Sequence, residues 1–193
     1  MNFLAHLFLS CERESLMVGN FLADFIRNRD VLLFPGPVIE GIYLHRKIDS
    51  YTDNHPVVRQ GVRRFYPYHR KYASVVIDVL YDYFLAKNWH LYTDQPLPEF
   101  AAQVYEGLLR HIEIMPQSLQ QQLQLMIKDD WLMNYTHYEG LEYTFQRLQK
   151  RVSKPEQIKG VIGSLQKHEE EIDKEFQLFF PEVIVYVREE CLC

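Results

Sequence analysis

One histidine and four aspartates recur at a spacing of four residues, which stacks side chains on one face of a helix. His45, Asp49 and Asp53 form the first series, in Leu-His-Arg-Lys-Ile-Asp-Ser-Tyr-Thr-Asp. One imidazole beside two carboxylates is a ligand set that suits a divalent ion such as Mn²⁺ or Mg²⁺. The alternative is a solvated polar stripe without a ligand, in which Asp53 belongs to the turn before Pro56.

Asp78 and Asp82 form the second series, in Ser-Val-Val-Ile-Asp-Val-Leu-Tyr-Asp-Tyr-Phe-Leu. Their neighbours are aliphatic or aromatic on almost every side, so both carboxylates are expected to be buried. Buried carboxylates on one helix face repel each other and lose their hydration, so they need a cation. That cation is either a metal ion or an arginine in a structural salt bridge.

Two further polar residues lie in apolar segments, Asp24 in Gly-Asn-Phe-Leu-Ala-Asp-Phe and His6 in Asn-Phe-Leu-Ala-His-Leu. A single histidine in such a segment is more often hydrogen-bonded in the core than a ligand. Helical bundles, however, build metal sites by pointing side chains inward from facing helices. We expect His6 to be a ligand or a proton donor. The metal ligands are expected among Asp24, His45, Asp49, Asp78 and Asp82, and the catalytic residues among His6, Asp24, His45 and Asp49.

No other catalytic motif is found: the chain has no glycine-rich phosphate loop, no Gly-x-Ser-x-Gly turn and no cysteine placed as a nucleophile. The remaining histidines fall in turns or on charged faces, so they are expected at the surface. They are His55, His69, His90, His111, His137 and His168.

Apolar residues at intervals of three and four, as in Val76, Leu80 and Tyr83, predict that helices position these side chains. Prolines divide the helices. The expected helices cover about 13–29, 38–53, 56–66, 70–91 and 98–114, and one ends near 133. A long C-terminal segment follows Pro155, and an interruption at Pro181 is left open. With no internal repeat or long linker, the prediction is an all-α, single-domain helical bundle over residues 1–193.

The composition limits the classes of protein that fit. The chain has 193 residues, 47% of them hydrophobic, and a net charge of −5, which fits a globular domain and disfavours nucleic-acid binding. No run of about 18 uncharged apolar residues occurs, so no membrane span is expected. Cys11, Cys191 and Cys193 fit no zinc-binding spacing, so we expect free thiols and a cytoplasmic protein.

Positive charge is concentrated in one stretch, because residues 54–77 contain no Asp or Glu. A basic surface on an acidic protein attracts an anionic partner. The alternatives are an ordinary solvated face, or a second basic cluster over 147–159. The predicted partner-binding residues are Arg46, Lys47, Arg59, Arg63, Arg64, Arg70 and Lys71.

Four motifs, in order and spacing, resemble those of the acyl carrier protein phosphodiesterase family over the whole chain. They are Asn-Phe-Leu-Ala-His, Gly-Asn-Phe-Leu-Ala-Asp-Phe, His-Arg-Lys-Ile-Asp with Tyr-Thr-Asp-Asn, and Asp-Val-Leu-Tyr-Asp-Tyr-Phe-Leu. The resemblance implies hydrolysis of the phosphodiester that joins 4′-phosphopantetheine to a serine of holo acyl carrier protein. It also implies Mn²⁺ as the metal, with Mg²⁺ as a substitute. Acyl carrier proteins are strongly acidic, which agrees with a basic docking surface.

The family is similar in turn to the all-helical HD-domain metal phosphohydrolases. This chain departs from their pattern because it has no adjacent His-Asp pair, and one helical turn separates His45 from Asp49. Two other functions stay open. An HD-type phosphohydrolase of nucleotides would need a base-stacking pocket, and a non-catalytic adaptor would bind the carrier protein without needing Mn²⁺. The sequence does not indicate an oligomeric state.

Overall fold

The computed structural model describes residues 1–191, and this part of the chain forms helices and turns without any strand. The prediction of an all-α fold is therefore confirmed. The α-helices are α1 (Phe3–Phe8), α2 (Glu14–Leu22), α3 (Gly36–Asn54), α4 (Pro56–His69), α5 (Ala73–Lys87), α6 (Leu97–Arg110), α7 (Gln117–Lys128), α8 (Tyr138–Gln149) and α9 (Val161–Cys191). Short 3-10 helices, such as η1 (Asn28–Leu33) and η5 (Met133–Thr136), connect some of them.

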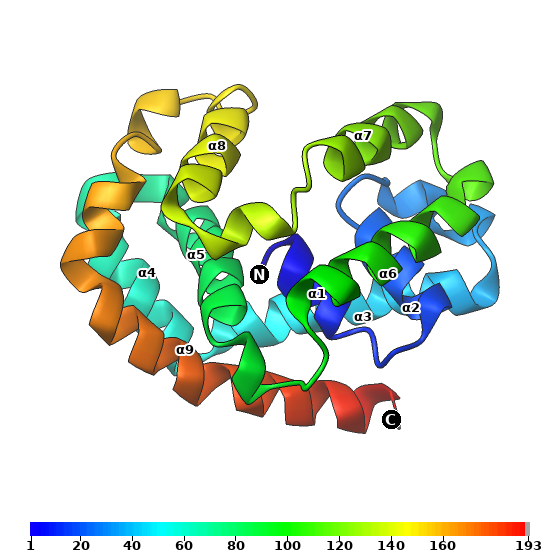
Figure 1. The fold of residues 1–193 in the computed structure, drawn as a ribbon, viewed down its shortest axis with the longest axis horizontal. Coiled ribbons are helices and arrows are strands. Elements are labelled where there is room, and N and C mark those ends of the chain that lie inside the picture. The colour runs from blue at the N-terminus through cyan, green and yellow to red at the C-terminus, as the bar shows by residue number, and fades with distance from the viewer. Residues whose placement is uncertain (192–193) are drawn as a thin grey trace.

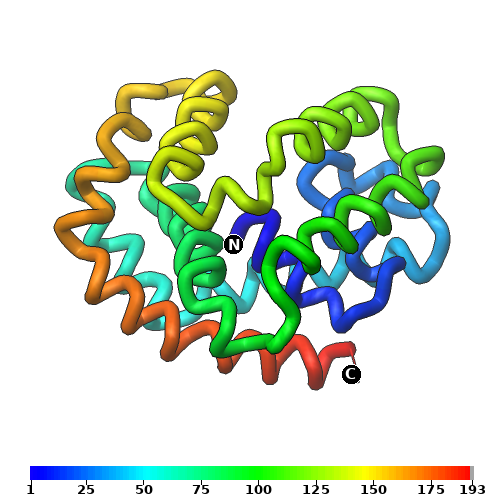
Figure 2. Tube along the Cα trace, in the orientation of Figure 1, coloured from blue at the N-terminus to red at the C-terminus, as the bar shows by residue number. Residues whose placement is uncertain are grey.

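The short helix α1 lies in the middle of the molecule, between two groups of helices (Figure 1). The helices α4, α5 and α8 form one group, and α2, α6 and α7 form the other. The chain trace shows α9 passing along the edge of both groups (Figure 2). Because α1 packs against both α2 and α5, side chains from the two groups meet around it.

Two glycines allow α2 and α3 to pack in close contact. A Cβ atom on Gly19 would lie 2.0 Å from a carbonyl oxygen of α3, and one on Gly41 would lie 2.3 Å from a carbonyl oxygen of α2. No side chain fits at either distance. The two backbones therefore meet directly, and this contact places Asn20 of α2 beside His45 of α3.

The start of α1 is fixed by an aspartate from α5. Asp82 is 0% exposed, and its carboxylate accepts hydrogen bonds from the backbone N–H groups of Asn2, Leu4 and Ala5 at 3.3, 2.7 and 3.2 Å. The first N–H groups of a helix have no partner within the helix, so a carboxylate placed there satisfies them. Asp82 thus fixes the helix that carries His6.

Several predicted helix boundaries are wrong. The helix expected over 13–29 ends at Leu22, and the one expected over 70–91 covers only α5. Pro67 lies inside the last turn of α4, which ends at Arg70 with a left-handed φ of 49°. In α9 the helix continues through Pro181, and its non-helical residue is His168, with φ −132° and ψ 15°. Helix α8 was not predicted.

The prediction of free thiols holds for Cys191 and is wrong for Cys11, which is disulfide-bonded. Cys193 lies outside the described residues. Within the described part of the chain, no helix combines the length and the hydrophobicity that a membrane crossing requires.

Candidate metal centre

Two histidines face one carboxylate at the centre of the molecule. Nε2 of His6, on α1, lies 3.0 Å from Oδ1 of Asp49, and Nε2 of His45 lies 3.1 Å from Oδ2 of the same residue. The two imidazole rings stack with their centroids 3.9 Å apart. One ligand atom from each of the three residues lies within 4.8 Å of the others, so a single ion can contact all three.

Asp24 completes this cluster on its open side. The residue follows the end of α2, and its Oδ1 lies 3.3 Å from Nε2 of His45. Its side chain is 44% exposed, whereas both histidines are buried. Two imidazole nitrogens and two carboxylates form a donor set that suits Mn²⁺, so the residues present fit the predicted ion. We refer to His6, Asp24, His45 and Asp49 as the four-residue cluster.

Asn20 orients both imidazole rings through their Nδ1 atoms. Its Oδ1 accepts hydrogen bonds from Nδ1 of His6 at 2.9 Å and from Nδ1 of His45 at 3.0 Å. Its Nδ2 donates to the carbonyl oxygen of His6 and to Oγ of Ser10, which fixes the orientation of the amide. Each ring therefore carries a proton on Nδ1, because an amide oxygen can only accept.

This arrangement directs both Nε2 atoms towards the carboxylate of Asp49. In a neutral imidazole with Nδ1 protonated, Nε2 carries a lone pair, which is the form that binds a metal. A lone pair facing a carboxylate needs a cation between them, either a second proton or a metal ion. Partners that orient metal-binding histidines in this way also tune the affinity for the metal.

The sequence analysis missed Asn20. The residue follows Gly19 and precedes Asp24 by four positions, in a motif otherwise composed of apolar residues. An amide in such a segment is a signal of the same kind as the carboxylate of Asp24. Its role could not be seen without the contact between α2 and α3.

The electrostatics of the cluster favour a cation at its centre. Burial disfavours the charged form of His45, but its hydrogen bonds with Asp24 and Asp49 outweigh burial and raise its pKa to about 9. Burial and the nearby His45 lower the pKa of His6. Burial opposes the charge of Asp49, yet hydrogen bonds from both histidines hold its pKa well below the usual range. Without a metal ion, the proton is therefore held on His45, between the carboxylates of Asp24 and Asp49.

The structure does not bring Asp82 into the cluster, because its carboxylate is used by the N–H groups of α1. Asp78 lies beside the cluster. Its Oδ1 is 3.0 Å from the α-ammonium nitrogen of Met1, and that nitrogen is 3.8 Å from Oδ1 of Asp49. Asp78 is only partly buried and pairs with the α-ammonium group of Met1, whereas the buried Asp82 accepts hydrogen bonds from uncharged backbone N–H groups, and burial raises its pKa to about 7. Within residues 1–191, neither carboxylate pairs with an arginine.

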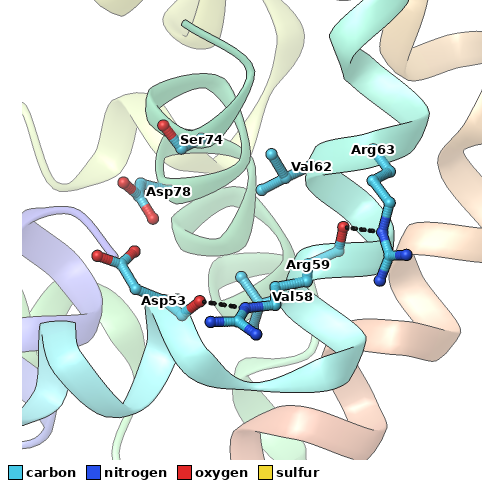
Figure 3. A pocket seen from close by; sticks show the side chains of 7 residues that line it. All are labelled: Asp53, Val58, Arg59, Val62, Arg63, Ser74 and Asp78. Carbon is cyan, nitrogen blue, oxygen red and sulfur yellow. Dashed lines mark hydrogen bonds between the residues drawn. The ribbon is translucent and has the colours of Figure 1, made fainter. Parts of the chain in front are cut away.

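A pocket of about 610 Å³ lies next to Asp78, between the end of α3, α4 and the first turns of α5 (Figure 3). Asp53 belongs to this pocket and not to the four-residue cluster. Burial and the neighbouring charge of Asp78 raise the pKa of Asp53. The residues that line the pocket are Asp53, Val58, Arg59, Val62, Arg63, Ser74 and Asp78.

Several of the predicted partner-binding residues are engaged within the molecule. Arg64 makes two hydrogen bonds to the buried carboxylate of Glu175, at 2.6 and 2.7 Å. Lys47 pairs with Glu190. These two contacts tie α4 and α3 to α9, so Arg64 and Lys47 have structural partners.

The other basic side chains are more accessible. Arg46 donates to Asn28 on η1. Arg59 donates to the carbonyl oxygen of Asp53 and to Oδ1 of Asn54 at the end of α3, while its side chain stays exposed. The exposed residues along α4 and the turn after it form one basic surface, which we call the α4 basic surface. It comprises Arg59, Arg63, Arg70 and Lys71.

Comparison with known proteins adds family evidence. The profile described as acyl carrier protein phosphodiesterase matches residues 1–183. Proteins named acyl carrier protein phosphodiesterase from Enterobacter sp. (strain 638) and Escherichia coli O6:H1 are similar to this chain. They are 30% identical over the full length of both chains, and 32% identical over 95% of this chain and 96% of the other. One from Yersinia enterocolitica is 31% identical over 94% of both chains. No solved structure matches. With nearly its whole length matched, this chain belongs to the acyl carrier protein phosphodiesterase family.

Proposed function

We propose that this protein is a Mn²⁺-dependent phosphodiesterase that hydrolyses 4′-phosphopantetheine from the serine of holo acyl carrier protein. The products are apo acyl carrier protein and free 4′-phosphopantetheine. The observation that carries the proposal is the four-residue cluster, in which Asn20 directs two imidazoles at one carboxylate. The name shared by the relatives supports the choice of substrate.

The residues that would hold the ion are His6, His45 and Asp49, with Asp24 at the exposed side of the cluster. A divalent ion bound there would activate water and neutralise charge on the phosphoryl oxygens, and Mg²⁺ would substitute for Mn²⁺. Asp24 faces only one of the two rings, whereas both oxygens of Asp49 face histidines, so Asp24 would orient the attacking water and accept its proton. Throughout the reaction, each buried histidine would keep its Nδ1 proton and donate it in a hydrogen bond to Oδ1 of Asn20.

A relationship to the HD-domain phosphohydrolases belongs to the same proposal. The relationship is supported by the residue types and their origin, because histidine and aspartate side chains from α1, α3 and the end of α2 converge on one point. The absence of an adjacent His-Asp pair distinguishes this chain from the usual pattern.

The α4 basic surface is the proposed docking site for the carrier protein. The stretch from residue 54 to residue 77 carries no acidic side chain, although the whole chain has a net charge of −5. An acidic partner is therefore attracted to this surface and repelled elsewhere. A cytoplasmic location, where this substrate would be met, stays a prediction.

The pocket beside the cluster argues against a nucleotide substrate. None of its lining residues is aromatic, so it offers no ring on which a base would stack. A non-catalytic adaptor differs from the proposed enzyme in its product. An adaptor would bind the carrier protein and leave its phosphodiester intact.

Intact-mass spectrometry of holo acyl carrier protein tests the proposal. With Mn²⁺, the protein is expected to remove the mass of the 4′-phosphopantetheine group, and chelation should stop the reaction. Asp49→Asn should lower turnover by at least about 100-fold, since it removes the negative charge and replaces one of the two carboxylate oxygens that face the histidines. The exposed Asp94→Asn is the matched control and should keep wild-type turnover.

Three results would contradict the proposal. They are turnover that needs no metal, hydrolysis of nucleotides in place of the carrier protein, and tight binding of the carrier protein without any change in its mass.

A further inference from the structure

We propose that the pocket between α4 and α5 binds the pantetheine arm of the substrate, with Val62 and Ser74 as the residues that select it. The inference rests on the proposed function, because it assigns a place to the part of that substrate beyond the phosphodiester. The ligand class is an uncharged chain that carries two amides and a dimethyl carbon and ends in a thiol.

The position of the pocket is the first argument. Asp53 lies one helical turn beyond Asp49 on α3, and Asp78 shares the Met1 ammonium group with Asp49. The carboxylates of Asp53 and Asp78 lie close together on one side of the pocket (Figure 3). A phosphodiester held at the four-residue cluster would therefore have the pocket directly beside it.

The size of the pocket is the second argument. Its volume of about 610 Å³ lies within the range of about 300–1,000 Å³ that is usual for small-molecule sites. A flexible arm of roughly twenty non-hydrogen atoms fits this range. A folded carrier protein does not, so only a protruding group of the substrate can enter.

The lining of the pocket is the third argument. Val58 and Val62 on α4 give it an apolar wall that suits the dimethyl carbon and the methylene groups (Figure 3). Ser74 is half-buried at the start of α5, and its hydroxyl has no hydrogen-bond partner within residues 1–191. That hydroxyl can bond to an amide of the arm. Arg59 and Arg63 lie at the exposed end, where the carrier protein would cover the opening.

The pocket also differs from the other large hollows of the described chain. The pocket between Phe8, Tyr92 and Arg188 has about 350 Å³, and no interaction within residues 1–191 joins its lining residues to Asp49, whereas the Met1 ammonium group joins Asp78 to Asp49. The same is true of the pocket lined by Glu14, Met17 and Arg110. Of these three pockets, the one beside Asp78 combines an apolar wall, a hydroxyl without a partner in residues 1–191 and a lining carboxylate that shares the Met1 ammonium group with Asp49.

Calorimetric titration with pantetheine tests the proposal without relying on catalysis. Pantetheine lacks the phosphate, so it reports on the arm site alone. Wild-type protein should bind it, and Val62→Trp, which fills the pocket, should weaken binding at least tenfold. The same variant should raise the KM for holo acyl carrier protein, while its Mn²⁺ affinity stays within twofold of wild type.

The matched control is Val185→Trp, which places the same side chain on an exposed position of α9 and should change neither binding nor KM. If Val62→Trp does not fold by circular dichroism, Ser74→Leu gives the second test and should weaken binding in the same direction. Equal pantetheine binding by wild type and these variants would overturn the inference, as would no binding by the wild type. Pantetheine binding without any Mn²⁺-dependent release of 4′-phosphopantetheine would uphold the pocket and refute the proposed function.

Discussion

At the scale of single residues, the chemistry of the centre depends on an amide that has no ligand role of its own. Asn20 fixes the proton on Nδ1 of both His6 and His45, which leaves each Nε2 free for a metal. If either ring could flip or change its tautomer, its Nε2 lone pair would no longer point towards the carboxylate of Asp49. Asn20 is thus a positioning residue for both of the histidines that we propose as ligands.

Replacing Asn20 by alanine should weaken Mn²⁺ binding by about 10–100-fold, because both imidazoles lose the hydrogen bond that orients them. Isothermal titration calorimetry measures this affinity. Asn28→Ala is the control, since Asn28 is an exposed amide whose side chain accepts a hydrogen bond from Arg46, and its loss should leave the affinity unchanged. Wild-type affinity in Asn20→Ala would show that the ligands are positioned without it.

The residue scale also shows what the sequence can predict of the site. The spacing of His45 and Asp49 places them on one helix face, and the structure has them 3.1 Å apart. The approach of His6 to Asp49 joins residues 43 positions apart, so no local pattern contains it. Asp82 had the same signal as Asp24, a carboxylate among apolar residues. Only the packing of α1 distinguishes its structural use from a ligand role.

At the scale of elements, the contact between α2 and α3 sets the geometry of the centre. Gly41 allows the two backbones to meet, one turn before His45. Gly41→Ala should lower the free energy of unfolding by about 1–3 kcal/mol, because its methyl group would overlap a backbone carbonyl. Urea denaturation measures this loss, and Mn²⁺ affinity should fall with it.

The control for this change is Gly163→Ala. A Cβ atom there has nothing within 4 Å, so alanine should stabilise α9 by about 0.5–1 kcal/mol through its higher helix propensity. If both variants changed stability in the same direction, the close contact of α2 and α3 would not be the reason for glycine at position 41.

The contact between α4 and α9 at His69 should make the free energy of unfolding depend on pH. His69 was predicted at the surface, but it is 1% exposed and bonds to the carbonyl oxygen of Gln157 and to Oγ of Ser164. It links the end of α4 to α9. Burial lowers its pKa below the usual value, although the bond to Gln157 opposes this. The unfolded chain therefore binds the proton more readily than the folded one.

The stability that depends on neutral His69 is present above pH 6.5 and is lost as pH falls below that value. His69→Gln should thus show a shallower loss of stability between pH 7 and pH 5 than the wild type, measured by urea denaturation at each pH. His90→Gln, at an exposed position, should keep the wild-type slope. Equal slopes in His69→Gln and the wild type would contradict the assignment.

Local sequence patterns predicted the elements better than their ends. The intervals of three and four identified α3, α4 and α6 within a few residues, because each of these helices has one buried face. Pro67 did not end α4, since the left-handed backbone at Arg70 does so three residues later. The kink of α9 at His168 has no proline or glycine beside it, and so no local signal.

At the scale of the whole molecule, the charges are divided unevenly. The protein is acidic in total, and the α4 basic surface adjoins the pocket beside Asp78. Attraction between exposed charges acts mainly on the rate of association and decays over about 10 Å at 0.1 M salt. Docking and chemistry should therefore respond separately to mutation.

Reversing two charges of this surface, Arg63→Glu and Arg70→Glu, should raise the KM for holo acyl carrier protein at least about tenfold and change kcat little. The difference from wild type should shrink as salt rises, and steady-state kinetics at two ionic strengths measures it. Lys150→Glu with Arg151→Glu, in the second basic cluster, is the control. If the control pair raised KM and the first pair did not, the carrier protein would dock over residues 147–159.

The central claim is that one divalent ion binds among His6, His45 and Asp49, with Asp24 beside it. Anomalous diffraction from crystals soaked in Mn²⁺ tests this most directly. The account predicts a single strong manganese peak in contact with Nε2 of both histidines and with the carboxylate of Asp49. A peak at Asp53 and Asp78 in its place, or no peak within the four-residue cluster at saturating Mn²⁺, would contradict it.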